Sequence, residues 1–195
     1  MAVTAFNTQT KGFKITSKRV FFIHGWGGTH PDHWQNWMVS QAKENVFAQM
    51  VLMPNPDFPV VHEWISTLFD VIVKPDKNTI LVGHSLGCPA ILRFLEKLPT
   101  GQKIGKAVLV AGFCQPLKVP AIDGFVQEPF DWKKIKSACS EFIVVHADND
   151  LRVPLKRGQF LADQLGVTLA IEPNGGHITT PQFGPYPRLW KRILK

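Results

Sequence analysis

The sequence lacks the features that mark membrane-spanning or secreted proteins. No apolar run approaches the roughly 20 residues that a membrane-spanning helix needs. The opening stretch MAVTAFNTQTKGFK has neither a long apolar segment nor a small-residue cleavage site, so we expect no signal peptide. Internal repeats and low-complexity segments are also missing. We therefore expect a cytoplasmic protein without a membrane span.

Cysteine is scarce, with only Cys88, Cys114 and Cys139. Their number is odd and their spacing matches no metal-binding or redox motif, which indicates reduced, buried thiols. The histidines of the first third of the chain also form no spaced ligand set. We therefore expect no metal site and no cofactor.

Acidic residues are outnumbered, 15 against 22 lysines and arginines, which gives a net charge of +7. Such a balance could attract nucleic acid, an anionic membrane surface or an anionic substrate. No aromatic-interleaved RNA motif or recognition-helix pattern accompanies the charge. We therefore expect a solvated basic surface and no nucleic-acid partner. Steeply salt-dependent binding to a polyanion would indicate the alternative.

Short apolar runs alternate with amphipathic stretches along a chain long enough for one domain, residues 1–195. Such runs are typical of strands that are buried on both faces of a parallel sheet. The predicted strands are Val20–Ile23, Met50–Met53, Ile80–Val82, Ala107–Ala111, Phe142–Val145 and Val167–Ile171.

Helical stripes lie between these runs. The clearest begin at Val61 and at Ile91, and weaker ones contain Trp34 and Phe160. The stretch 181–190, rich in proline and aromatic residues, receives no assignment. The alternation predicts an α/β fold, a single compact domain with a mostly parallel sheet of about six strands and helices on both faces. The chain is too short for a large lid.

The segment TILVGHSLGC, residues 79–88, contains a candidate catalytic serine. It runs from a buried strand through Gly83-His84-Ser85-Leu86-Gly87 into an amphipathic helix. Glycines at this spacing let the backbone pack closely, so that a serine can occupy a strained turn with its hydroxyl exposed. We therefore expect Ser85 to be a nucleophile. Cys88, three residues later, is expected to pack in the core.

A serine hydroxyl needs a base, and the base needs an acid to orient it. His177 follows the last predicted strand and is the best candidate base among seven histidines. Asp148 and Asp150 both follow the fifth strand. We favour Asp150, because it lies at the turn before the next helix, and expect Asp148 to support the loop. The oxyanion donors would be the backbone N–H groups of Leu86 and of Trp26, in the glycine loop His24–Gly28.

These motifs resemble those of the α/β-hydrolases, and within them the small, lidless serine hydrolases of the retinoblastoma-binding protein 9 group. The likeness runs from about Arg19 to His177 and includes LMPNPDFP, GHSLG, PFDWKKIK, DNDLRVP and NGGH in the family's order. Carried over by position, the resemblance implies Ser85 as nucleophile, Asp150 as acid and His177 as base. It also implies hydrolysis of small esters or amides.

The only long insertion, from Phe113 to Trp132, could supply the substrate pocket. Its aromatic residues Phe113, Phe125, Phe130 and Trp132 could line an apolar pocket with Trp26 or could simply cover the core.

We expect a serine hydrolase of the carboxylesterase type that acts on a small-molecule ester. Amidase, aminopeptidase or thioesterase activity on the same triad is the first alternative. A binding protein without catalysis is the second, because a fold does not determine a function. The sequence specifies no oligomeric state.

Overall fold

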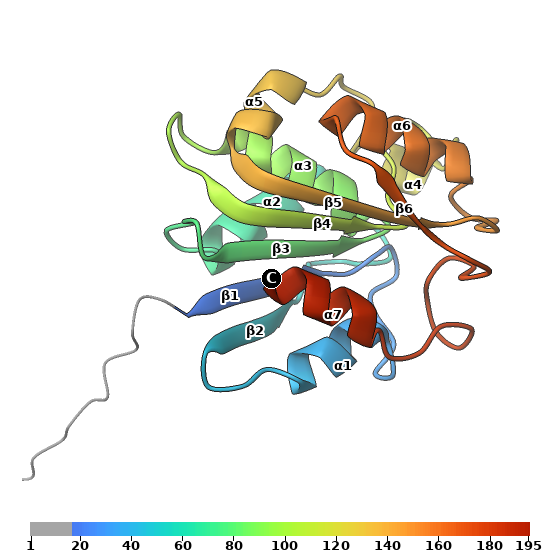
Figure 1. The fold of residues 1–195 in the computed structure, drawn as a ribbon. Helices are drawn as coiled ribbons and strands as arrows, with labels where there is room; N and C mark the ends of the chain where they lie inside the picture. The colour runs from blue at the N-terminus through green and yellow to red at the C-terminus, as the bar shows by residue number, and fades with distance from the viewer. Residues whose placement is uncertain (1–16) are drawn as a thin grey trace, which may run out of the picture.

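The computed structural model describes residues 17–195, and these form one six-stranded sheet in the order β2-β1-β3-β4-β5-β6 (Figure 1). Every neighbouring pair of strands is parallel. The strands are β1 (Lys18–Ile23), β2 (Val46–Val51), β3 (Thr79–His84), β4 (Ile104–Val110), β5 (Cys139–Ala147) and β6 (Leu169–Glu172). The N-terminal stretch for which we expect no signal peptide lies outside the described residues.

Helices cover both faces of this sheet (Figure 1). The helices are α1 (Trp34–Ser40), α2 (Val61–Val71), α3 (Gly87–Lys97), α4 (Pro120–Asp123), α5 (Trp132–Ser137), α6 (Leu155–Leu165) and α7 (Pro187–Leu194). One face carries α2, α3, α5 and α6, and the opposite face carries α1 and α7. Within residues 17–195, none of these helices is long and apolar enough to cross a bilayer.

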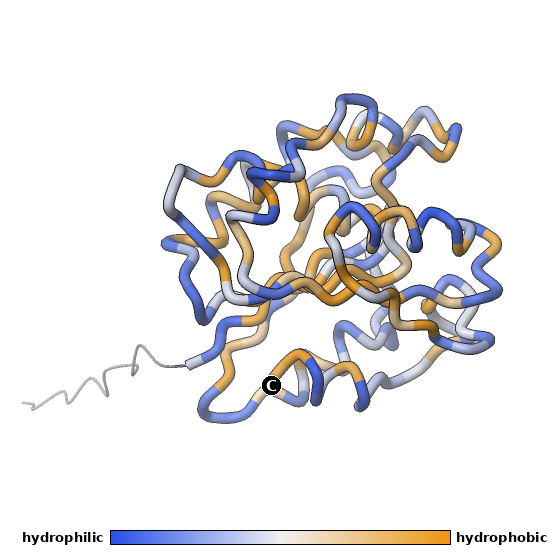
Figure 2. The backbone as a smooth tube through the Cα atoms, turned by 45° about the horizontal axis from the view of Figure 1, so that its top comes forward, coloured by the Kyte–Doolittle hydropathy of each residue, from blue (hydrophilic) through white to orange (hydrophobic). Residues whose placement is uncertain are grey.

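Alternate residues of the central strands feed two hydrophobic cores, one on each face. In β1, Phe21 packs with the side chains of α2 and α3, whereas Phe22 packs with those of α1 and α7. Figure 2 shows the resulting concentration of hydrophobic residues in the interior, where the strands run. Burial on both faces explains why the central strands are continuous apolar runs.

The predicted α/β fold with about six parallel strands is confirmed, and most elements lie where the pattern placed them. The exception among the strands is β2, which the sequence places at Met50–Met53 and which runs from Val46 to Val51. It is an edge strand, and Phe47 on it is 40% exposed. An edge strand that is only partly buried does not need a continuous apolar run. The apolar run at Met50–Met53 therefore did not show where β2 begins.

The helix α7 occupies the stretch that the sequence left unassigned. Leu189, Trp190 and Ile193 point into the core beneath β1 and β3. Tyr186, just before the helix, donates a hydrogen bond to the buried carboxylate of Glu172, which ends β6. The tail thereby closes the face of the sheet that α1 leaves open.

Because all the strands are parallel, their carboxyl ends meet at one edge of the sheet. The segments that follow β1, β3, β5 and β6 emerge there, and they carry the glycine loop, Ser85, Asp150 and His177. Strand order thus brings Ser85 and His177 together, although they lie 92 residues apart in the chain.

Candidate active site

Ser85 lies in a strained turn between β3 and α3. Its φ angle is +51°, in the left-handed region that non-glycine residues rarely adopt. The turn is possible because its flanking glycines allow close backbone contacts. A Cβ atom on Gly83 would lie 2.8 Å from the Gly87 backbone, and one on Gly87 would lie 2.3 Å from the carbonyl oxygen of Ile23.

The three residues expected to form a triad are in direct contact. The Oγ atom of Ser85 lies 3.0 Å from Nε2 of His177. The Nδ1 atom of the same ring lies 2.7 Å from Oδ2 of Asp150. The Asp150 side chain is fully buried, and its other oxygen accepts hydrogen bonds from the backbone N–H groups of Arg152 and Val153. The carboxylate is therefore rigidly held against the imidazole.

Asp148, the alternative acid, faces another way. Its Oδ1 atom accepts a hydrogen bond of 2.8 Å from the backbone N–H of Asn174. The next residue, Asn149, accepts one of 2.7 Å from the N–H of Gly176. These contacts clip the loop after β5 to the loop that carries His177. Asp148 thus supports the loop, and Asp150 alone of the two contacts the imidazole.

The glycine loop after β1 is positioned by its own hydrogen bonds. Gly27 donates to the carbonyl oxygen of Pro56 at 2.9 Å, and the Trp26 indole donates to that of Asp57 at 2.8 Å. Within residues 17–195, the backbone N–H groups of Trp26 and Leu86 donate to no other protein group. Neither N–H group is therefore taken up by another acceptor in this part of the protein.

Further histidines are buried around the triad. Burial lowers the pKa values of His24, His84 and His146, and it lowers that of His33 to about 4. His24 contacts Gly25 O with Nδ1 and accepts from Met53 N with Nε2, which ties the glycine loop to the end of β2. Since His24 and His84 lie inside the two glycine motifs of the sequence, a role in shaping those turns can be predicted from it. It gives no signal that His84 also contacts His177.

A cavity of about 380 Å³ opens in front of Ser85. This volume suits a small organic ligand. Its walls come from the glycine loop, the triad loops and the insertion after β4. The side chains in its lining include Trp26, His33, Leu117, Val119, Ile122 and Arg152.

The insertion does line the cavity, but not through the aromatic residues that the sequence suggested. Phe113, Phe130 and Trp132 pack in the core against α3 instead. Phe113 is completely buried. The guanidinium carbon of Arg93 lies 3.8 Å from the centroid of the Phe130 ring. This corrects the pocket prediction. The largest side chains bury more apolar area over α3 than at an open cavity.

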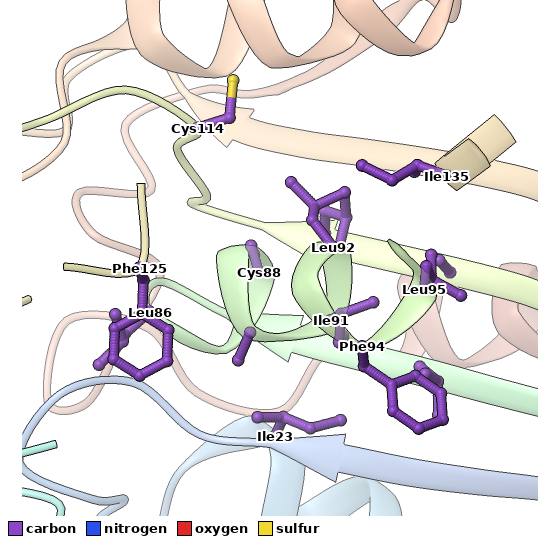
Figure 3. Close-up of a cluster of buried hydrophobic side chains, with 14 of the residues drawn as sticks. Ile23, Leu86, Cys88, Ile91, Leu92, Phe94, Leu95, Cys114, Phe125 and Ile135 are labelled. Atoms are coloured by element: carbon purple, nitrogen blue, oxygen red, sulfur yellow. The ribbon is translucent and has the colours of Figure 1, made fainter. Parts of the chain in front are cut away.

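The same packing involves Phe125, whose ring lies 5.3 Å from that of Trp64. Figure 3 shows α3 surrounded by buried side chains, with Phe125 and Ile135 among those contributed by neighbouring segments. The insertion lines the cavity through the aliphatic residues Leu117, Val119 and Ile122, which sequence reasoning missed. The carboxylate of Asp123 accepts hydrogen bonds from two backbone N–H groups in this turn. The available signal in the sequence was Asp123, an acid that follows a short apolar stretch and can bind its backbone N–H groups.

The three cysteines are free and buried. Burial raises the pKa of Cys114 and of Cys139 to about 12 and raises that of Cys88 further. Cys88 contacts the carbonyl oxygens of Gly83 and Val110 inside the core. Across residues 17–195, no group of three His, Cys, Asp or Glu side chains is arranged to hold a metal ion.

Comparison with known proteins places the chain in a family. The model of the serine hydrolase family matches residues 20–195. The hydrolase YdeN of Bacillus subtilis is 37% identical over 163 residues, which cover 83% of this chain and 86% of YdeN. The serine hydrolase RBBP9 of Rattus norvegicus is 26% identical over 91% of this chain and 96% of its own. The crystal structure of the B. subtilis ydeN gene product superimposes with a TM-score of 0.86, at 34% identity, over 91% of this chain and 97% of that one.

Proposed function

The chain belongs to the serine hydrolase family, and on that premise we propose that it cleaves small carboxylic esters through Ser85, His177 and Asp150. One observation carries the proposal. A single imidazole contacts the serine hydroxyl through Nε2 and a buried carboxylate through Nδ1. A protein that only bound a ligand would not need all three groups in this arrangement.

The proposed reaction begins with proton transfer. His177 takes the hydroxyl proton of Ser85 as Oγ attacks the ester carbonyl carbon. Asp150 keeps Nδ1 protonated and stabilises the imidazolium that forms. The N–H groups of Trp26 and Leu86 donate to the developing oxyanion.

The tetrahedral intermediate then collapses. The C–O bond to the alcohol breaks, His177 returns its proton to the departing oxygen, and an acyl-enzyme remains on Ser85. Water, deprotonated by the same imidazole, attacks the acyl carbon. Collapse of the second intermediate releases the acid and restores the serine hydroxyl.

Esters are the proposed substrates, rather than amides, for a chemical reason. An alkoxide or phenoxide leaves more readily than an amine, so a simple triad with an open cavity suffices. The cavity of about 380 Å³ and its aliphatic wall favour a short acyl or alcohol part. The free, buried thiols also support our proposal that the protein works in the reducing cytoplasm.

Labelling with a fluorophosphonate probe tests this function. The purified protein should be labelled, and the Ser85→Ala variant should be neither labelled nor active on p-nitrophenyl acetate. Parallel assays with p-nitrophenyl esters, anilides and thioesters identify the preferred leaving group. Absence of labelling in a folded wild-type protein would contradict the proposal and favour a binding protein on a hydrolase fold.

A further inference from the structure

The cavity in front of Ser85 is lined without a single acidic side chain. Arg152 is the one permanently charged residue among those that line it. His33 lines it too, but its pKa of about 4 keeps this ring neutral near pH 7. The lining of the cavity therefore carries a positive side chain and no negative one, and the Asp150 carboxylate lies buried behind His177.

The backbone of Arg152 is held by a hydrogen bond, whereas its guanidinium forms no hydrogen bond or ion pair with the described residues. Its backbone N–H donates to Oδ1 of Asp150 at 2.8 Å, so its position depends on the triad acid itself. Within residues 17–195, no acceptor contacts its guanidinium. Arg93 and Arg157, in contrast, donate to backbone carbonyl oxygens and to side chains of their neighbours. A solvent-exposed guanidinium at the cavity rim can thus take its partner from solution.

Arg152 shares its cavity with the reacting centre. It lines the same cavity as Ser85 and His177. The chain as a whole carries a net charge of +7, which adds to the positive potential. A cleft with one sign of charge concentrates ligands of the opposite sign.

An aliphatic wall shares the cavity with this cation. Leu117, Val119 and Ile122 form the wall, and the carboxylate of Asp123 is occupied by the N–H groups of residues 117 and 119. That carboxylate therefore does not compete for the guanidinium. A ligand that fits both features has a short hydrocarbon part and an anionic end.

We propose that the substrate is a small ester that also carries a carboxylate, with its hydrocarbon part against Leu117, Val119 and Ile122 and its carboxylate paired with Arg152. This inference rests on the proposed ester hydrolysis and names its substrate class. A guanidinium can hold a carboxylate through two parallel hydrogen bonds, which gives orientation as well as attraction.

Matched ester pairs test the inference. On the acyl side, mono-p-nitrophenyl adipate is compared with the p-nitrophenyl ester of adipic monoamide, which has the same shape and no charge. On the alcohol side, para-acetoxybenzoate is compared with para-acetoxybenzamide. The Ser85→Ala protein supplies the blank. The charged ester of at least one pair should have a kcat/KM about three to five times that of its neutral partner, as expected for one partly exposed ion pair.

The variants assign the preference to one side chain. Arg152→Gln should bring the charged-to-neutral ratio to about one, and Arg152→Glu should reverse it. Lys156→Gln makes the same change of charge on an exposed residue nearby that does not line the cavity, and it should keep the wild-type ratio. In the wild-type protein the ratio should also fall as salt is raised, which needs no variant.

The outcomes separate this inference from the function on which it rests. Hydrolysis of the neutral esters by the wild type, but not by Ser85→Ala, supports ester hydrolysis whatever the ratio. A ratio of one or below in both pairs, or a preference that survives Arg152→Gln, overturns the carboxylate proposal alone. If the wild type hydrolyses none of the four esters, the proposed function fails and this inference fails with it.

Discussion

The Nε2 atom of His84 lies 2.9 Å from the backbone carbonyl oxygen of His177, and the two imidazole rings are 5.0 Å apart. Because a carbonyl oxygen only accepts, Nε2 of His84 carries the proton. Burial lowers the pKa of His84 well below its usual value, so the ring is neutral. The residue before the candidate nucleophile thus positions the candidate base without placing a second charge beside it.

Removal of this hydrogen bond should slow the reaction. His84→Phe keeps a ring in the same space but cannot donate a hydrogen bond to the backbone carbonyl oxygen of His177. The backbone that carries the His177 imidazole is then held less firmly. We expect kcat to fall about tenfold with little change in KM, because small displacements of a catalytic group are costly. His84→Gln, which retains an N–H donor, should keep more activity. Steady-state kinetics and thermal unfolding of both variants measure this. A Phe variant with wild-type kcat would show that His84 only packs.

The two aspartates of the β5 loop should differ sharply in their effect. Asp150→Asn should lower kcat by about four orders of magnitude, because the amide no longer holds His177 in the required tautomer. Asp148→Asn should keep most activity, since the asparagine oxygen can still accept from Asn174 N–H. The comparison of kcat/KM on one p-nitrophenyl ester measures the difference. The reverse ranking would move the acid to Asp148.

The elbow should not tolerate a methyl group at its second glycine. A Cβ atom at Gly87 would lie 2.3 Å from the carbonyl oxygen of Ile23, so α3 would have to move away from β1. We expect Gly87→Ala to destabilise the protein by about 3 kcal/mol or more. Gly184→Ala is the control, because its Cβ would meet nothing within 4 Å, and its effect should stay within about 1 kcal/mol. Urea unfolding compares the two, and equal stabilities would contradict the close contact.

His33 should make stability depend on pH in the acid range. Its pKa is lowered to about 4 in the folded protein, while the unfolded chain has the usual value of about 6.5. Between these values the unfolded state binds the extra proton, so stability falls as pH falls from about 6.5 towards 4. Above about pH 6.5 both states are neutral and this contribution vanishes.

The matched variant for this prediction is His33→Asn. Asparagine still offers an oxygen to Gln35 N–H at the start of α1, where His33 now accepts with Nδ1. Between about pH 7 and about pH 4.5, the wild type should lose roughly 2 to 3 kcal/mol more of its unfolding free energy than the variant. Urea unfolding at the two pH values measures this. Equal losses would show that His33 is not held neutral.

Thiol reagents should leave hydrolysis intact. Cys88 lies only three residues from Ser85, but it is completely buried and burial raises its pKa. The reactive thiolate is therefore absent near neutral pH. Treatment of the folded protein with iodoacetamide should change neither fluorophosphonate labelling nor ester hydrolysis. Loss of activity that Cys88→Ala prevents would contradict this.

The sequence by itself determined the fold and the kinds of groups at its active edge. Continuous apolar runs indicate strands that are buried on both faces, and they predicted the central strands. Helical stripes indicate helices that are buried on one face, and they predicted α2 and α3. The positions of Ser85 and His177 directly after strands were enough to place both at one edge, because parallel strands share their carboxyl ends. Local periodicity did not locate the edge strand β2, whose burial is incomplete.

Only the tertiary structure decided which side chains face the cavity. Phe113 and Phe130 were candidates for its wall, yet α3 offered them a larger apolar surface, and the smaller Leu117 and Val119 remained at the rim. The contact between His84 and His177 likewise depends on how the loop after β6 packs against the end of β3. An irregular segment lacks the hydrophobic periodicity that indicates the buried face of a helix or strand. Which of its side chains are buried therefore depends on the surface against which it packs.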